Sequence, residues 1–224
     1  MTRDDPLIVL VHGAGHDSSV WDATRAAMRA ATLAVDLPGR AGRPASLCDV
    51  TVADAAAAIV GDVAAAAPGP VLLVGHSVAG TVLPSVAAQL GERVLGMVFV
   101  AGIAVGQGEV PIARYLPERL EQVTEAFAAL CAEHRGNAME RLDVKTASSI
   151  DSLNFSLQPM EWAGVGPEVP RTYVRCLRDP IQPRPMQDLF IAATGATEVI
   201  DIDTGHTPAI DNPTALAHIL DTLA

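Results

Sequence analysis

Short apolar runs alternate with alanine-rich helical patterns along the first hundred residues, and this alternation restricts the fold more than any other feature. The apolar runs that predict strands are residues 7–11, 32–39, 71–75 and 93–102. The patterns that predict helices are residues 19–30, 51–67 and 78–90, with Ser18 or Ser19 expected to cap the first and Thr51 the second. Apolar strands that alternate with helices are typical of a parallel sheet covered on both faces.

The alternation stops at Gly102 and resumes near residue 171. Residues 103–170 contain no convincing strand pattern but include a helical stretch at 116–134 and a polar, aromatic-bearing piece at 149–162. Strand patterns return at 171–179 and 197–203, each followed by a helical pattern, 183–194 and 212–223. We therefore expect an α/β fold with a mostly parallel, doubly wound sheet of about six strands. Residues 1–102 and 171–224 are predicted to form its core and 103–170 a helical insertion; with half of its 224 residues hydrophobic, the chain suits one substantial core.

Charge and hydropathy exclude several classes of partner. The formal net charge is −11 and no basic cluster stands out, so neither nucleic acid nor an anionic membrane surface is an expected partner. No run reaches the roughly 18 apolar residues of a membrane span. The first residues, MTRDDPLIVLVHG, lack the apolar region and cleavage site of a signal peptide, so we expect a cytoplasmic protein.

Three cysteines are scattered along the chain at Cys48, Cys131 and Cys176. Their odd number and wide separation argue against a disulfide framework, and the absence of a CxxC spacing argues against a zinc site. We expect all three to be buried as small hydrophobic residues.

Ser77 follows an apolar strand directly, in the stretch VLLVGHSVAG at residues 71–80. A serine between a strand and a helix, with small residues at Gly75, Ala79 and Gly80, fits a sharp turn that projects its hydroxyl above the sheet. The start of the following helix would place backbone N–H groups where an oxyanion forms. The alternative is that Ser77 only caps that helix.

A histidine and an aspartate follow two later strands. His206 lies after the last predicted strand and Asp179 ends the strand before it, and carboxyl ends of parallel strands share one sheet edge. The imidazole could serve Ser77 as a base, and the carboxylate could hold its tautomer. Other aspartates compete for the second role: Asp36, Asp201, Asp203 and Asp211. A loop histidine without a catalytic role is the alternative for His206.

The turn HGAGH, residues 12–16, follows the first strand and could donate a second backbone N–H to the oxyanion site. The motif is weak alone. The four candidates together indicate a catalytic site more strongly. Each lies at a predicted strand end, in the order first-strand turn, serine, aspartate and histidine.

Taken together, these segments resemble the α/β-hydrolases, and specifically the compact esterases related to plant methyl-ester hydrolases and hydroxynitrile lyases. The matching stretches are VLVHGAGHDSSVW, DLPGRAG, VLLVGHSVAG, LRDPIQPRPMQDLF and TGHTPAIDNPTALAHIL. The resemblance implies Ser77 as nucleophile, Asp179 as acid and His206 as base. It also implies an oxyanion hole from the backbone N–H groups of Ala14 and Val78, and it makes the insertion a cap over the pocket.

The chain departs from that family pattern at a few positions. The sharp turn that carries Ser77 is called the elbow here. Ala79 stands where glycine is usual in this elbow, and a tight turn tolerates its methyl group. The hydroxynitrile lyases carry a threonine and a lysine where this chain has Gly13 and Thr207, so the resemblance favours hydrolysis over lyase chemistry.

The expected reaction is hydrolysis of a small-to-medium, mostly apolar carboxylic ester through an acyl-enzyme, without a metal or organic cofactor. The predicted pocket comprises Gly15, Ile103, Phe155, Met160, Trp162 and Thr207. For the apolar residues of the insertion, packing against the core is an equal alternative to lining the pocket. Two other functions remain open: a thioesterase or lactonase of a biosynthetic pathway, and a non-hydrolytic relative that binds or rearranges a small molecule. A homodimer formed through the insertion or an edge strand is compatible with the sequence.

Overall fold

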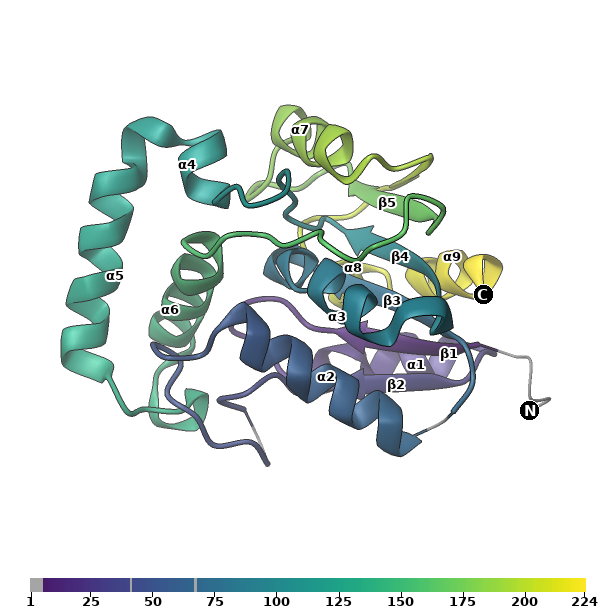
Figure 1. Cartoon of the computed structure of the whole chain (residues 1–224), viewed down its shortest axis with the longest axis horizontal. Helices are drawn as coiled ribbons and strands as arrows, with labels where there is room; N and C mark the ends of the chain where they lie inside the picture. Colours follow the sequence, from purple (N-terminus) through teal and green to yellow (C-terminus); the bar gives the residue numbers. More distant parts are fainter. Residues whose placement is uncertain (1–5, 41, 67) are drawn as a thin grey trace.

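The fold is a six-stranded sheet with helices on both faces, as the computed structural model of the chain shows (Figure 1). The structure describes residues 6–40, 42–66 and 68–224. The sheet order is β2-β1-β3-β4-β5-β6, and every neighbouring pair runs parallel. The strands are β1 (Leu7–Val11), β2 (Thr32–Val35), β3 (Val71–His76), β4 (Val94–Val100), β5 (Arg171–Cys176) and β6 (Glu198–Ile202). The predicted fold class is confirmed.

The strands form where the sequence is continuously apolar. All residues of β1 and β3 are buried, because each of their faces packs against helices. Figure 1 shows α2 (Val52–Ala66) and α3 (Leu83–Leu90) in front of the sheet, and α1 (Asp22–Ala27) and α9 (Pro213–Leu223) behind it. The two faces contribute to separate hydrophobic clusters, so the sheet is the middle layer of three.

The remaining helices lie in the insertion and near the chain's C-terminal end. They are α4 (Pro111–Tyr115), α5 (Leu120–His134), α6 (Val144–Ser156), α7 (Arg184–Thr194) and α8 (Pro208–Asp211). Short 3₁₀ helices are η1 (Ser18–Trp21), η2 (Ser77–Thr81), η3 (Gly91–Arg93), η4 (Pro117–Arg119) and η5 (Met139–Arg141).

The first predicted helix, residues 19–30, differs from the structure in both its start and its end. The chain first forms the 3₁₀ turn η1, and α1 then ends at Ala27. The cap is Asp17, whose carboxylate accepts a hydrogen bond from the Ser19 N–H at 2.9 Å, so the expectation of Ser18 or Ser19 as cap was wrong. Thr51 does cap the next helix: its hydroxyl oxygen accepts from the Asp54 N–H at 3.0 Å.

Residues 103–170, called the cap segment from here on, carry α4, α5 and α6 between β4 and β5. These helices lie together at one end of the sheet (Figure 1). Side chains of α5 and α6 form a third hydrophobic cluster with Leu47 and Cys48 of the β2–α2 loop. The cap segment therefore packs on the core loops as well as on itself, and its separation as a domain stays a prediction.

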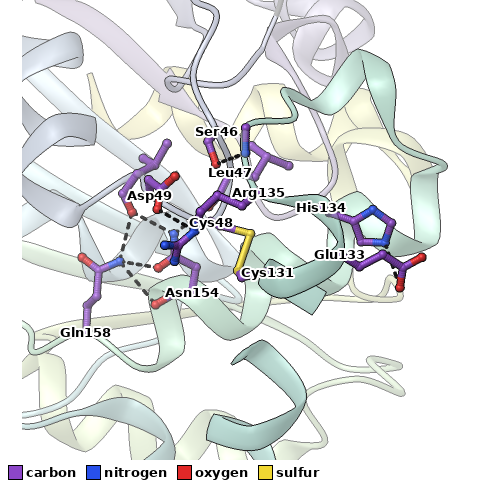
Figure 2. The surroundings of a disulfide bond; sticks show 12 residues. Ser46, Leu47, Cys48, Asp49, Cys131, Glu133, His134, Arg135, Asn154 and Gln158 are labelled. Carbon is purple, nitrogen blue, oxygen red and sulfur yellow. Dashed lines mark hydrogen bonds and ion pairs between the residues drawn. A yellow bond between two sulfur atoms is a disulfide. The ribbon is translucent and has the colours of Figure 1, made fainter. Parts of the chain in front are cut away.

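A disulfide joins Cys48 of the β2–α2 loop to Cys131 of α5 (Figure 2). The expectation that the cysteines form no disulfide was wrong, because their 83-residue separation in sequence closes to 5.6 Å between Cα atoms when α5 packs on the loop. All three cysteines are buried, and Cys176 is free. Disulfides persist mainly in oxidising compartments, so the cytoplasmic location stays a prediction that the oxidation state of this pair can test. Within the described ranges, no helix is both long and apolar enough to cross a bilayer.

Candidate active site

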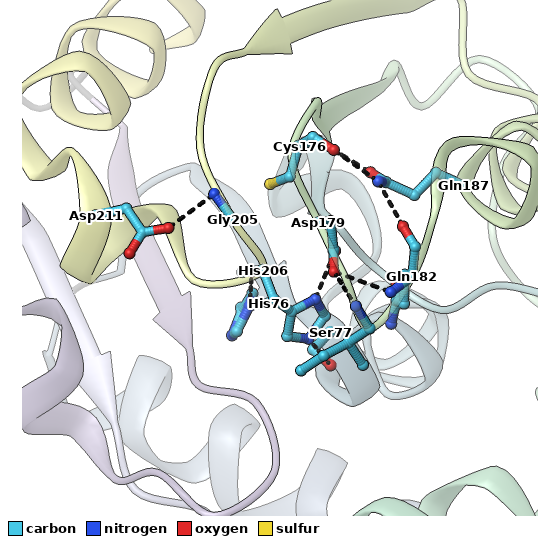
Figure 3. Close-up of polar contacts among 10 residues, drawn as sticks. His76, Ser77, Cys176, Asp179, Gln182, Gln187, Gly205, His206 and Asp211 are labelled. Atoms are coloured by element: carbon cyan, nitrogen blue, oxygen red, sulfur yellow. Dashed lines mark hydrogen bonds and ion pairs between the residues drawn. The ribbon is translucent and has the colours of Figure 1, made fainter.

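Three polar side chains from three strand ends form one hydrogen-bonded chain (Figure 3). Ser77 follows β3, Asp179 follows β5 and His206 follows β6. The Ser77 Oγ lies 3.0 Å from His206 Nε2, and His206 Nδ1 lies 2.6 Å from Asp179 Oδ2. The parallel sheet brings these residues to one edge although 129 positions separate Ser77 from His206.

The backbone at Ser77 has the sharp bend expected of a serine between strand and helix. Its φ is +56°, a left-handed value that costs a non-glycine residue conformational energy and is characteristic of functional sites. Two glycines make the bend fit. A Cβ on Gly75 would lie 2.9 Å from the Leu83 side chain, and one on Gly80 would lie 2.5 Å from the Ile103 carbonyl oxygen. Gly75 therefore lets β3 approach α3, and Gly80 lets η2 approach the backbone of the loop after β4.

The carboxylate of Asp179 is fixed by more than the imidazole. Its Oδ1 accepts hydrogen bonds from the backbone N–H groups of Ile181 at 2.8 Å and Gln182 at 2.9 Å. Burial alone would raise the pKa of Asp179, but the hydrogen bonds from His206 and from these two N–H groups together hold it below its usual value. Asp179 is thus ionised at neutral pH and can hold a proton on Nδ1 of His206.

The aspartates that competed for this role have other partners. Their contacts are the Ser18 N–H for Asp36, Arg175 for Asp201, Arg178 for Asp203 and the Gly205 N–H for Asp211. The structure therefore pairs His206 with Asp179.

His12 fixes the loop after β1 to the loop after β2. This buried imidazole donates from Nδ1 to the Gly13 carbonyl at 2.9 Å and accepts from the Leu37 N–H at Nε2, 3.2 Å away. Burial lowers the pKa of His12 to about 3, so the ring is neutral. A Cβ on Gly13 would lie 2.7 Å from His76 Nδ1 and 3.1 Å from the Ser77 Cβ. The loop thus lies directly beside the serine.

The two predicted oxyanion donors are the residues that follow the two members of this contact, Gly13 and Ser77. Ala14 follows Gly13 and packs against the core, and Val78 is the second residue of η2. The first N–H groups of a helix have no acceptor within the helix, so the Val78 N–H is free of an intrahelical bond. The position of both residues is compatible with an oxyanion hole, which stays a proposal.

The predicted pocket residues lie in different surroundings. The Ile103 N–H donates to the Ser77 carbonyl at 2.9 Å, which places that residue beside the elbow, and Thr207 follows His206 at the start of α8. Phe155 and Met160 are fully buried in the main hydrophobic cluster. The Trp162 ring lies 6.2 Å from that of Phe99, between centroids, and 4.8 Å from the Arg171 guanidinium carbon. The contacts of Phe155, Met160 and Trp162 are those of the packing alternative.

A cleft of about 540 Å³ opens beside the loop after β1. Gly15, His16, Ala209 and Ile210 are among its lining residues. It borders the loop and α8, but neither Ser77 nor His206 lines it.

Sequence reasoning missed two groups that support the site. His76 donates from Nε2 to the His206 carbonyl at 2.8 Å, and its position next to Ser77 was the signal that could have identified it. Arg40 and Asp151 form a buried ion pair across 111 positions, for which a single sequence offers no signal.

Comparison with known proteins agrees with this geometry. Residues 8–219 match the alpha/beta hydrolase family, so the chain belongs to the α/β-hydrolase family. It is 25% identical to the pyrethroid hydrolase of Sphingobium wenxiniae over 253 aligned residues, which cover 97% of this chain and 87% of that protein.

Two solved structures share the fold. An extracellular α/β-hydrolase from a Paenibacillus species superposes with a TM-score of 0.79 at 17% identity, covering 98% of this chain and 99% of that one. A methylesterase from Arabidopsis gives a TM-score of 0.67 at 20% identity, and the alignment covers 96% of this chain and 97% of that one. These findings confirm the predicted resemblance to the α/β-hydrolases, and the methylesterase shares the fold of this chain.

Proposed function

We propose that the protein hydrolyses a carboxylic ester through a Ser77–His206–Asp179 triad and a covalent acyl-enzyme. The observation that carries the proposal is the hydrogen-bonded chain from Ser77 Oγ through the imidazole to Asp179, with the serine held at φ +56°. Helix capping alone would require neither the strained φ nor a base at 3.0 Å.

The chemistry follows from the geometry in two mirrored steps. His206 Nε2 takes the proton of the Ser77 hydroxyl while Oγ attacks the ester carbonyl carbon. The oxygen that becomes negative is stabilised by the N–H groups of Ala14 and Val78. The intermediate collapses, and the leaving alcohol takes the proton from His206. Water then gives a proton to His206, attacks the acyl-enzyme and releases the acid, and the proton returns to Oγ.

A small-to-medium, mostly apolar ester is the substrate class that we propose. Its support is the buried, apolar surroundings of the elbow and the relatives described as a pyrethroid hydrolase and a methylesterase. Lyase chemistry has less support, because the threonine of the lyases at position 13 would meet the His76 ring, where even a Cβ comes within 2.7 Å.

The direct test is labelling with a fluorophosphonate, read by intact-protein mass. We expect one adduct on the wild-type protein and none on Ser77→Ala. A panel of p-nitrophenyl esters, matched thioesters and lactones then measures kcat/KM for each class. Higher turnover of oxyesters supports the proposal, whereas preferred thioesters or lactones select that alternative. An unlabelled wild-type protein without turnover of any of them would favour the non-hydrolytic function.

A further inference from the structure

A fully buried ion pair connects the core to the cap segment beside the active site. Arg40, in the loop after β2, contacts Asp151 of α6 through its guanidinium Nη2. Only 1% of the Arg40 side chain and 2% of the Asp151 side chain are exposed. The Arg40 guanidinium also donates from Nη1 to the Pro38 carbonyl at 2.9 Å.

Both members of the pair also bind the loop that carries Ala14. The Gly15 N–H donates to Asp151 Oδ2 at 3.0 Å, and Arg40 Nε donates to the His16 carbonyl at 3.2 Å. The two residues that follow Ala14 are therefore held by opposite members of one ion pair.

The loop also packs tightly on α6 at the same place. Gly15 has φ +69°, and a Cβ there would lie 2.6 Å from the Ser148 Cβ, one helical turn before Asp151. Backbone conformation, packing and hydrogen bonding thus fix the same residue against the cap segment.

Stability is a poor explanation for such a pair. Removing two charges from water is costly, and well-packed apolar residues of similar volume often stabilise a protein as well or better. Burial lowers the pKa of Arg40 and raises that of Asp151, although each opposes the shift of the other. What apolar replacements cannot supply is the acceptor for the Gly15 N–H and the donor for the His16 carbonyl.

We propose that Asp151 and Arg40 are positioning residues, which fix the Ala14 N–H where the oxyanion forms and thereby make the cap segment part of the catalytic apparatus. This inference rests on the proposed function. Neither residue touches the reacting atoms; both act through the backbone of the β1 loop. Because an error of about 1 Å in a catalytic group can cost about 100-fold in rate, losing these contacts should lower kcat more than it raises KM.

The test compares kcat for each titrated active site with thermal stability. The number of sites comes from the endpoint of fluorophosphonate labelling, so misfolded protein does not count. Asp151→Asn keeps an acceptor but leaves Arg40 without its counter-charge, and we expect its kcat to fall roughly 10- to 100-fold with KM nearly unchanged. The matched control is Asp62→Asn, which breaks the ion pair between Arg43 and Asp62, a residue of α2 and not of the cap segment. It should keep wild-type kcat.

The decisive variant is the double substitution Arg40→Met with Asp151→Leu. It removes both buried charges and fills the space, so we expect its Tm to return toward the wild-type value while kcat stays low. Recovery of kcat together with Tm would make the pair purely structural and overturn the inference. If the double variant does not fold, wild-type kcat per site in Arg40→Met, which removes the donor to the His16 carbonyl, overturns it instead. Failure of the proposed function is seen separately, in wild-type protein that neither labels at Ser77 nor hydrolyses esters.

Discussion

His76 Nε2 lies 2.8 Å from the backbone carbonyl oxygen of His206 and donates a hydrogen bond to it. The residue that precedes the serine therefore holds the main chain of the residue proposed as its base. The two rings lie 5.0 Å apart, and burial lowers the pKa of His76 to about 3, so this ring is neutral. Elbow and base are thus connected through the backbone as well as through the Ser77 hydroxyl.

Loss of this donor should impair turnover. His76→Leu leaves the His206 carbonyl without its partner, and we expect kcat per titrated site to fall about 10-fold because the imidazole is less well placed. His76→Gln retains an amide donor of similar reach and should recover part of the loss. Equal, wild-type values of kcat in both variants would show that the contact does not position His206.

Asp179→Asn should lower kcat by about three to four orders of magnitude. The amide cannot stabilise the imidazolium and can stabilise the wrong tautomer of His206. Asp203→Asn is the matched control, because that carboxylate forms an exposed ion pair with Arg178 and its loss should leave kcat unchanged. Steady-state kinetics on one ester decides; comparable rates for the two variants would remove Asp179 from the mechanism.

Two glycine-to-alanine substitutions should change stability in opposite directions. Gly80→Ala places a Cβ 2.5 Å from the Ile103 carbonyl oxygen, so we expect a loss of about 1–3 kcal/mol in the free energy of unfolding and lower activity. Gly61→Ala lies in α2, where a Cβ meets nothing within 4 Å, and should stabilise by about 1 kcal/mol through helix propensity. Urea unfolding of both variants provides the check. A neutral Gly80→Ala would contradict the tight approach of η2 to Ile103 in the loop after β4.

Acid should destabilise the protein below about pH 6.5. His12 and His76 have pKa values lowered to about 3 by burial, whereas in the unfolded chain they titrate near 6.5. Between these values the unfolded state binds more protons, so stability rises with pH and falls as pH drops through this window. Each group contributes a slope of up to about 1.4 kcal/mol per pH unit.

Urea unfolding between pH 7 and pH 5 measures that slope. His76→Gln should make this slope shallower than in the wild-type protein. An identical slope in His76→Gln and wild type would mean that His76 does not titrate in this way.

Reduction should lower the stability of the wild-type protein. Cys48 and Cys131 close a loop of 83 residues, which corresponds to about 4.5 kcal/mol in the chain-entropy account of disulfides. We expect a reductant to lower Tm in wild type but not in the Cys48→Ser, Cys131→Ser double variant. A wild-type Tm that does not respond to reductant would show that the pair is not bridged in solution.

The fold could be predicted because its strands carry their own signal. β1 and β3 are buried on both faces, so each appears in the sequence as an uninterrupted apolar run with a polar residue at its end. That pattern locates Ser77 after β3. Asp179 and His206 follow the more polar strands β5 and β6, and topology brings all three strand ends to one edge. Helix boundaries were less accurate where side chains override propensity, as at Asp17, which caps η1 in place of a serine.

The contacts of the cap segment could not be predicted in the same way. The Arg40–Asp151 pair and the disulfide each join the β2–α2 region to a helix of the cap segment. Such contacts depend on how two separate elements pack, which neither periodicity nor local composition records. The same holds for Trp162, whose partners Phe99 and Arg171 lie on two different strands.

The bridge between Cys48 and Cys131 also limits how the enzyme can move. The cap segment is joined to the core at its two chain connections, and the disulfide adds a third point of attachment at α5. With this third attachment, the cap segment cannot pivot freely about its two chain connections. While the bridge is intact, the mouth of the active site should therefore keep one size, and the bulk of an ester should decide its entry. Reduction should relax that limit first for the bulkiest esters.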